Sequence, residues 1–288
     1  MKQAYSVVIV GAGPAGLSAA VNVCARGKTA LVVGSDVRQS PLYKAERIDN
    51  HLGMPALTGP EFLAQITAHA QQSGADFVTG RVLNLMPTGS GFYLSVGNDM
   101  VQADAVVLAG GVVRNVKLSG EAEYLGKGVS YCATCDGMLY RGKTVAVLGY
   151  SADAPEEANH LKQIGCEVLY FPKHPPMGLD EGIFSAPLKN PSVIGDEVVT
   201  AVENDGKQYP VSAVFIHRLA VAPTDLLPDL AVEGGYIQVN RQMETNIPGV
   251  FAAGDCTGLP LQISKAVGEG LIAGQAAAAY VTKHETKK

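Results

Sequence analysis

Two cysteines three residues apart, followed directly by an acid, are the part of this sequence best suited to chemistry. Cys132 and Cys135 belong to the run Cys-Ala-Thr-Cys-Asp, which ends at Asp136. A pair at this spacing can form a redox disulfide, supply half a metal site, or be structural. We favour the redox disulfide, in which one thiolate attacks, the second thiol resolves, and Asp136 gives and takes the proton.

A metal site is disfavoured, and we predict none. Tetrahedral zinc needs four ligands, and the sequence has no second Cys-x-x-Cys and no His-x-x-His. Cys24, Cys166 and Cys256 stand alone, and we expect them to be small buried apolar side chains. An odd number of cysteines at these spacings is unlike the disulfide scaffold of a secreted protein.

A phosphate-binding turn is indicated near the N-terminus by Gly11, Gly13 and Gly16, which form Gly-x-Gly-x-x-Gly between a predicted strand and helix. The glycines would permit a tight turn, close backbone approach to a pyrophosphate, and close helix packing. The phosphates would meet the N-terminus of the helix. Asp36 is the candidate partner of a ribose hydroxyl. The sequence therefore predicts a dinucleotide site, and the alternative is a glycine-rich turn that serves only packing.

The elements that would position these motifs form two βαβ units. The first has strands at 5–10 and 29–34 around a helix ending near residue 26, and the second has strands at 143–149 and 166–172 around a helix at 155–164. Further predicted elements are a helix at 60–73, β segments at 76–86, 91–97, 100–104, 103–111 and 249–255, and a closing helix at 262–283. The pattern predicts an α/β fold of two similar domains, the middle one inserted into the first.

Composition excludes several classes of protein. A net charge of −5 gives no reason to expect binding to nucleic acid or to an anionic membrane. No apolar run reaches the roughly 18–20 residues of a spanning helix, and the chain enters its first strand without a signal peptide. We therefore expect a cytoplasmic protein without a membrane partner.

Three segments together resemble the low-molecular-weight thioredoxin reductase family: VVIVGAGPAG at 7–16, GVSYCATCDG at 128–137 and IPGVFAAGDC at 247–256. The similarity runs nearly end to end. It implies two Rossmann-like domains that bind FAD and NAD(P) in the family, with an FAD-binding domain at 1–113 and 236–288 and a central disulfide domain at 114–235. It also implies FAD as cofactor, thioredoxin as substrate, and a homodimer.

The resemblance also implies roles for individual residues. Cys135 would be the cysteine nearer the flavin and the one that exchanges with the substrate dithiol, and Cys132 would complete the disulfide. Asp255 would hold the ribityl or phosphate region of FAD, and the alternative role for it is a helix N-cap. The implied FAD contacts are Gly11, Gly13, Pro14, Ala15, Gly16, Asp36, Asn50, Ala109, Gly110, Gly254, Asp255, Gln262 and Ile263.

The central domain departs from the family where NADPH would bind. The family's Gly-Gly-Gly-x-Ser/Thr-Ala loop is replaced by the residues from Gly149 to Ala154. Side chains at Tyr150 and Ser151 would obstruct a phosphate, and the carboxylate of Asp153 would repel it. The family's arginine pair is replaced at 172–174 by Pro-Lys-His, and Lys173 lacks the guanidinium fork.

These departures resemble the ferredoxin-dependent flavin thioredoxin reductases, which implies reduced ferredoxin as the electron donor. Charge does not support this step, because residues 114–235 hold 10 Lys and Arg against 16 Asp and Glu, a net charge of −6. An acidic ferredoxin would not be steered to such a domain as a whole. Two alternatives stay open: an NADPH-dependent thioredoxin reductase with a divergent loop, and a flavin- and disulfide-containing redox sensor without turnover.

Overall fold

The chain forms two compact units. The computed structural model describes residues 2–35, 37–40, 42–97, 99–112, 117–151, 154–218 and 222–285. The first unit comprises Met1–Arg114 and Ala222–Lys288, and the second comprises Asn115–Val221. The sequence placed the second boundary after residue 235. The structure groups the segment from residue 222 with the first unit, because α5 (Pro223–Leu226) packs against β4 (Val82–Thr88).

The first unit is built on a mixed sheet. Its strands lie in the order β3 (Asp76–Thr79), β2 (Ala30–Gly34), β1 (Ala4–Val10), β6 (Asp99–Leu108), β5 (Gly91–Val96) and β4. Strands β3, β2, β1 and β6 are parallel, and β17 (Val250–Ala252) pairs in parallel with the end of β6. The carboxyl ends of β1, β6 and β17 therefore meet at one edge of the sheet. A small hairpin, β15 (Val232–Glu233) and β16 (Tyr236–Ile237), and a 3₁₀ turn, η1 (Val37–Gln39), lie outside the sheet.

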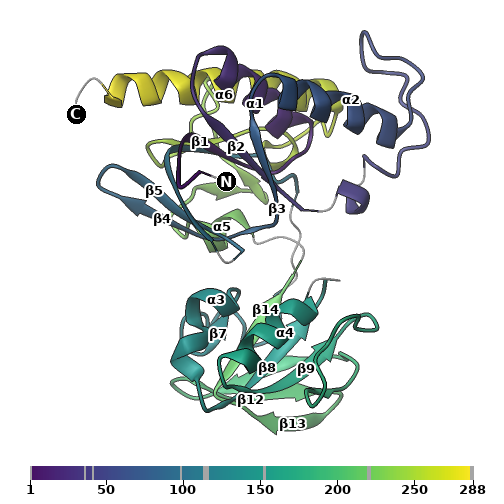
Figure 1. Ribbon diagram of the computed structural model, residues 1–288, viewed down its shortest axis with the longest axis vertical. Coiled ribbons are helices and arrows are strands. Elements are labelled where there is room, and N and C mark those ends of the chain that lie inside the picture. Colours follow the sequence, from purple (N-terminus) through teal and green to yellow (C-terminus); the bar gives the residue numbers. More distant parts are fainter. Residues whose placement is uncertain are drawn as a thin grey trace. The chain divides into compact units, whose positions relative to one another are not determined.

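Two helices of the first unit pack unusually closely. The helices α1 (Pro14–Ala25) and α6 (Ile263–Glu285) lie side by side (Figure 1). A Cβ added at Gly270 would lie 2.1 Å from the carbonyl oxygen of Ala15, and one at Gly274 would lie 2.5 Å from that of Ala19. The glycines of α6 thus permit backbone contact between the two helices. Another helix of this unit, α2 (Gly59–Gln72), begins with a capping box formed by Thr58 and Glu61.

Several predicted elements differ at their ends. The segment predicted at 76–86 is two strands, because β3 pairs in parallel with β2 whereas β4 pairs antiparallel with β5. The segments predicted at 100–104 and 103–111 are the single strand β6. The strand predicted at 249–255 ends at Ala252, and Asp255–Thr257 form a 3₁₀ turn, η3.

The second unit has three layers around a parallel sheet. Its strands lie in the order β10 (Phe184–Ser185), β9 (Glu167–Pro172), β8 (Thr144–Gly149), β14 (Ala213–His217) and β7 (Val129–Ser130). The helix α4 (Ala154–Gln163) packs on one face, and an antiparallel sheet of β11 (Ser192–Gly195), β12 (Val199–Asn204) and β13 (Lys207–Pro210) packs on the other.

The sequence of β8 explains this layering. Val145 and Val147 pack in the cluster that contains the α4 residue Leu161, whereas Ala146 and Leu148 pack with the antiparallel sheet. Successive strand residues point to opposite faces, so a strand covered on both faces is a continuous apolar run. The arrangement confirms the predicted α/β class. None of the described helices combines the length and apolar character needed to cross a membrane.

Candidate functional site

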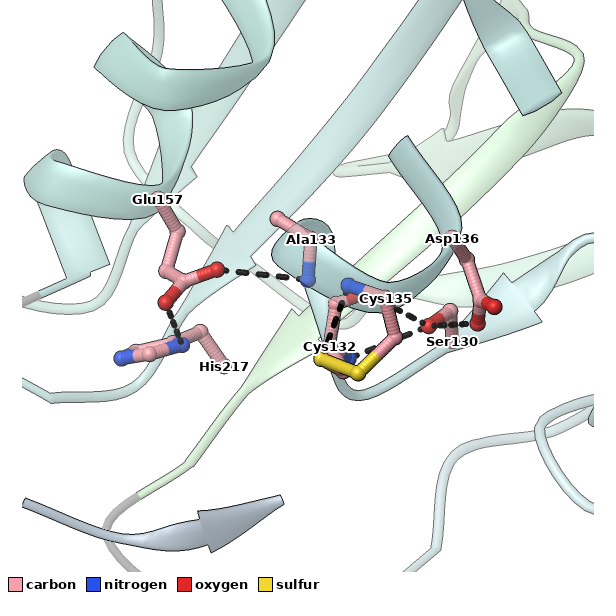
Figure 2. Close-up of a disulfide and its surroundings, with 7 residues drawn as sticks. All are labelled: Ser130, Cys132, Ala133, Cys135, Asp136, Glu157 and His217. Atoms are coloured by element: carbon pink, nitrogen blue, oxygen red, sulfur yellow. Dashed lines mark hydrogen bonds and ion pairs between the residues drawn. A yellow bond between two sulfur atoms is a disulfide. The ribbon is translucent and has the colours of Figure 1, made fainter. Parts of the chain in front are cut away.

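The predicted cysteine pair is a disulfide at the start of a short helix. Cys132 and Cys135 have Cα atoms 5.3 Å apart and bonded sulfurs (Figure 2). Helix α3 (Ala133–Asp136) follows Cys132 directly, and the backbone N–H of Cys135 donates to the Cys132 sulfur at 3.1 Å. Cys132 is only 4% exposed, whereas Cys135 is exposed. Cys135 is therefore the more accessible residue of the pair.

The predicted acid belongs to the same hydrogen-bond cluster. The Ser130 hydroxyl donates to Oδ2 of Asp136 at 2.6 Å, and the Cys132 N–H donates to the same hydroxyl at 3.1 Å (Figure 2). Ser130 thereby links the carboxylate to the backbone of the buried cysteine. The sequence analysis did not name Ser130, although its position at the end of β7 directly precedes the motif.

A second carboxylate approaches the disulfide turn from α4. The N–H of Ala133 donates to Oε2 of Glu157 at 3.3 Å, and Oε1 of Glu157 lies 4.0 Å from Nδ1 of His217. Figure 2 shows this pair on the other side of the turn from Asp136. The Glu157 and His217 side chains are 17% and 4% exposed. Both were missed, because no local pattern in the sequence connects α4 and β14 to the cysteine motif.

The other cysteines are unsuited to thiol chemistry. Cys166 and Cys256 are buried and Cys24 is half-buried. Burial raises the pKa of all three thiols, to about 12 for Cys256. Among the described residues, no three His, Cys, Asp or Glu side chains are grouped so as to hold a metal ion.

The glycine-rich turn lies at the carboxyl edge of the first unit's sheet. A Cβ at Gly11 would lie 2.3 Å from the carbonyl oxygen of Ala109, and one at Gly16 would lie 1.9 Å from that of Gly11. A Cβ at Gly13 would meet no atom within 4 Å. Gly11 and Gly16 are thus required by packing, whereas Gly13 leaves bare backbone beside open space. This is the arrangement that a pyrophosphate requires.

Other predicted cofactor residues converge on this edge. Pro14 begins α1, and a Cβ at Gly254 would lie 2.8 Å from the Cβ of Ala15. Gly110 is exposed beside them in the loop that follows β6. Asp36 lies outside the described residues. The structure therefore brings the loops after β1, β6 and β17 together, as a dinucleotide site requires.

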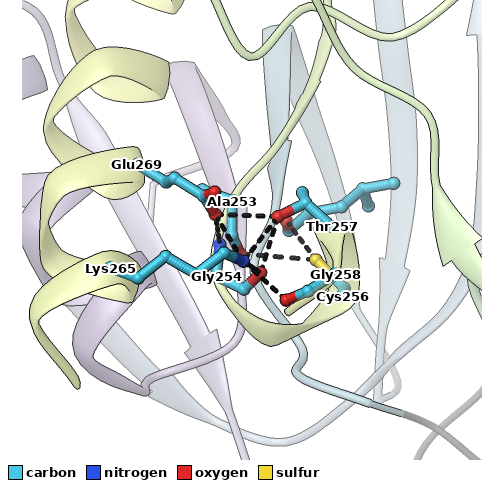
Figure 3. Close-up of polar contacts among 8 residues, drawn as sticks. Ala253, Gly254, Cys256, Thr257, Gly258, Lys265 and Glu269 are labelled. Carbon is cyan, nitrogen blue, oxygen red and sulfur yellow. Dashed lines mark hydrogen bonds and ion pairs between the residues drawn. The ribbon is translucent and has the colours of Figure 1, made fainter. Parts of the chain in front are cut away.

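The segment that carries Asp255 is fixed by an ion pair that the sequence analysis missed. The Lys265 ammonium donates to the carbonyl oxygens of Gly254 and Gly258, both at 2.8 Å (Figure 3). Glu269 lies 3.1 Å from that ammonium and accepts the Gly254 N–H at 2.8 Å. Burial raises the pKa of Asp255. The i, i+4 spacing of Lys265 and Glu269 on the closing helix is the signal that could have identified them.

Two further predicted residues meet although 212 positions separate them. Nδ2 of Asn50 donates to Oε1 of Gln262 at 2.9 Å, and the adjacent Ile263 begins α6. Beside them, Nδ1 of His51 lies 3.2 Å from the Ser264 hydroxyl. The loop at residue 50 is thus tied to the N-terminus of α6.

In the second unit, the one glycine kept in the divergent loop has a structural role. A Cβ at Gly149 would lie 2.6 Å from the Tyr170 hydroxyl oxygen and 2.9 Å from the Cβ of Ala154. Packing therefore requires a glycine at this position whether or not a ligand binds. Ser151 is 7% exposed and its hydroxyl has no hydrogen-bond partner within the described part of the chain, which omits residues 152 and 153.

The chain resembles known proteins over almost its whole length. The family model for pyridine nucleotide-disulphide oxidoreductases matches residues 5–178 and 179–270. A thioredoxin reductase from Treponema pallidum is 32% identical to the chain, and the match covers 98% of this chain and 98% of that protein. A thioredoxin reductase from Listeria innocua is 30% identical, and the match covers 96% of this chain and 94% of that protein.

Solved structures give closer matches. A ferredoxin-flavin thioredoxin reductase from Clostridium acetobutylicum is 38% identical, with a TM-score of 0.84 over 99% of this chain and 100% of that one. The atypical thioredoxin reductase TRi from Desulfovibrio vulgaris Hildenborough is 34% identical, with a TM-score of 0.73 over 96% of this chain and 98% of that one.

Proposed function

The chain belongs to the pyridine nucleotide-disulphide oxidoreductases, among the thioredoxin reductases, and on this premise we propose that it reduces thioredoxin with electrons from reduced ferredoxin. The observation that carries the proposal is the Cys132–Cys135 disulfide, which joins one buried and one exposed cysteine. The lost nucleotide motifs and the likeness to a ferredoxin-flavin thioredoxin reductase support the donor.

FAD is the proposed cofactor, since the family consists of flavoproteins and the turn at Gly13 leaves room for a pyrophosphate. The residues proposed to hold it are Gly11, Gly13, Pro14, Ala15, Gly16, Asp36, Asn50, Ala109, Gly110, Gly254, Asp255, Gln262 and Ile263. A bound FAD would supply the two electrons that open the Cys132–Cys135 bond, and would accept them singly from a one-electron carrier.

The reduced cysteines then exchange with the substrate disulfide. The Cys135 thiolate attacks one substrate sulfur and forms a mixed disulfide, and the second substrate sulfur leaves as a thiolate that takes a proton. Asp136, oriented by Ser130, is the proposed proton donor. The Cys132 thiol loses its proton and attacks the Cys135 sulfur. This step releases the dithiol substrate and restores the disulfide.

The surface beside Cys135 suits a protein partner. Met138 and Leu139, in the 3₁₀ turn η2 (Gly137–Tyr140), are 59% and 70% exposed. Apolar side chains exposed next to a reactive sulfur favour docking of another protein over reaction with a small polar thiol. This supports thioredoxin, or a thioredoxin-like protein, as the substrate.

Replacing the exposed cysteine tests the proposed function. Cys135→Ser should abolish ferredoxin-driven thioredoxin reduction while the protein keeps its flavin, measured by turnover and by visible absorbance. The matched control, Cys24→Ser, should retain turnover because Cys24 lies at the C-terminal end of α1 in the first unit, whereas the pair belongs to the second. Sustained turnover by Cys135→Ser would contradict the mechanism.

One observation favours a second candidate, an NADPH-dependent thioredoxin reductase. The Ser151 hydroxyl is buried without a partner among the described residues, and such a group is normally hydrogen-bonded to water or a ligand. NADPH consumption coupled to thioredoxin reduction without ferredoxin would establish this candidate in place of the first.

A further inference from the structure

Four neighbouring strands of the second unit end at the same edge of its parallel sheet, and the residues that follow them lie in one network. Lys173 follows β9, Tyr150 follows β8, Arg218 follows β14 and Tyr131 follows β7. In open α/β sheets, ligands bind in the crevice outside the carboxyl ends of the strands. These four side chains therefore originate where a nucleotide would bind.

Tyr150 is the centre of this row. The Lys173 Nζ lies 5.8 Å from the centre of its ring, and the Arg218 Cζ lies 5.2 Å from the same point. Both distances are within the range of cation–π attraction, about 6 Å. Tyr150 also packs against the hydrophobic cluster that includes Leu148 and Phe171. The ring is thus held by the core and by two cations of its own chain.

The arginine is fixed in turn by a fully buried acid. The two guanidinium Nη atoms of Arg218 lie 2.6 and 2.7 Å from the Glu121 carboxylate, which is 0% exposed. The Tyr131 hydroxyl donates to the same carboxylate at 2.8 Å, and so does the Leu118 N–H. A bidentate pair at this depth is costly to break. Arg218 is therefore held by the Glu121 carboxylate and the Tyr150 ring, whereas an arginine in a nucleotide site would bind a phosphate of the ligand.

We propose that Tyr150, held by Lys173 and Arg218, occupies the place of a dinucleotide in the second unit and determines that pyridine nucleotides do not bind. The inference rests on the proposed function, in which NADPH is not the donor, and names the side chain that excludes it. On this account the crevice is filled by the chain itself, and exclusion does not depend on the missing glycines alone.

Binding of NADPH to variants of the FAD-loaded, oxidised protein tests this inference by calorimetry. Tyr150→Gly restores bare backbone and removes the ring, and we expect it to bind NADPH at least tenfold more tightly than the wild-type protein. Tyr150→Phe keeps the ring and should bind no better than wild type. Tyr150→Ala provides the same test where the glycine variant does not fold.

The outcomes separate this inference from the proposed function. The role of the Tyr150 ring would be overturned if folded Tyr150→Gly or Tyr150→Ala bound NADPH no more tightly than the wild-type protein. It would also be overturned if Tyr150→Phe gained as much affinity as those variants. Neither result would contradict the proposed electron donor. Tight NADPH binding by the wild-type protein, with reduction of its flavin, would overturn both the inference and the proposed donor.

Discussion

At the scale of single residues, the sulfur atoms differ in how easily they can be reached and ionised. Cys135 is exposed, Cys132 is buried, and burial raises the pKa of Cys256 to about 12. The thiolate is the nucleophile, so a raised pKa and burial both suppress reaction. Thiol chemistry is thereby confined to the motif although the chain has five cysteines.

Alkylation should reveal this order directly. When the reduced, folded protein is treated with iodoacetamide at pH 8, we expect Cys135 to be modified first and Cys256 to stay unmodified. A thiol with a pKa near 12 is ionised to only about one part in ten thousand at this pH. Peptide mass spectrometry gives the order, and labelling of Cys256 at the rate of Cys135 without denaturant would contradict it.

The carboxylate at Glu157 should influence the stability of the disulfide. Its bond to the Ala133 N–H places a negative charge beside the start of α3, where it disfavours a thiolate at Cys132. Glu157→Gln should therefore favour the dithiol, by about tenfold in equilibrium with a reference thiol, or ~30 mV in midpoint potential.

A neighbouring acid supplies the control for this effect. Glu156 lies on the same helix but is exposed, and the structure gives it no bond to the disulfide turn. Glu156→Gln should leave the potential unchanged in the same redox titration. Equal potentials for the Glu157 variant and the wild-type protein would show that this carboxylate has only a structural role.

At the scale of elements, the sheet edge that carries the glycine-rich turn depends on how closely α1 and α6 pack. Gly270→Ala would place a Cβ against the Ala15 carbonyl and force the helices apart, which should destabilise the protein by about 1–3 kcal/mol. Gly268→Ala, on the same helix but exposed with no atom near the new Cβ, should stabilise it by up to ~1 kcal/mol. Thermal unfolding measures both changes, and a loss of stability in Gly268→Ala equal to that in Gly270→Ala would contradict this account.

The elements also show which features a sequence can predict. The cysteine motif, the glycine-rich turn and the βαβ units were predicted because each signal lies within about 30 residues. The contacts of Glu157 with Ala133 and of Arg218 with Glu121 were not, since they join residues 24 and 97 positions apart. The boundary at residue 222 was missed because α5 is a single turn whose assignment depends on packing against β4.

At the scale of the whole molecule, one unit is inserted into the chain of another, yet each has its own core. The second unit has two hydrophobic clusters, on either side of its parallel sheet. The pair formed by Glu121 and Arg218 joins the beginning and the end of this unit. Such a unit should fold without the rest of the chain.

Expression of residues 115–221 alone tests this independence. We expect a cooperative thermal transition by circular dichroism, a Cys132–Cys135 disulfide by mass spectrometry, and no bound flavin, because the glycine-rich turn belongs to the other unit. An unfolded fragment would show that the core of the second unit is insufficient for independent folding. A fragment that binds flavin would contradict the assignment of the cofactor site to the first unit.

The absorbance of the flavin distinguishes a thioredoxin reductase that takes electrons from ferredoxin from one that takes them from NADPH. The purified protein is mixed without oxygen with excess NADPH, and reduced ferredoxin is added afterwards. We expect the flavin to stay oxidised with NADPH and to bleach with ferredoxin. Prompt bleaching by NADPH would contradict this expectation and would identify an NADPH-dependent enzyme with a divergent loop.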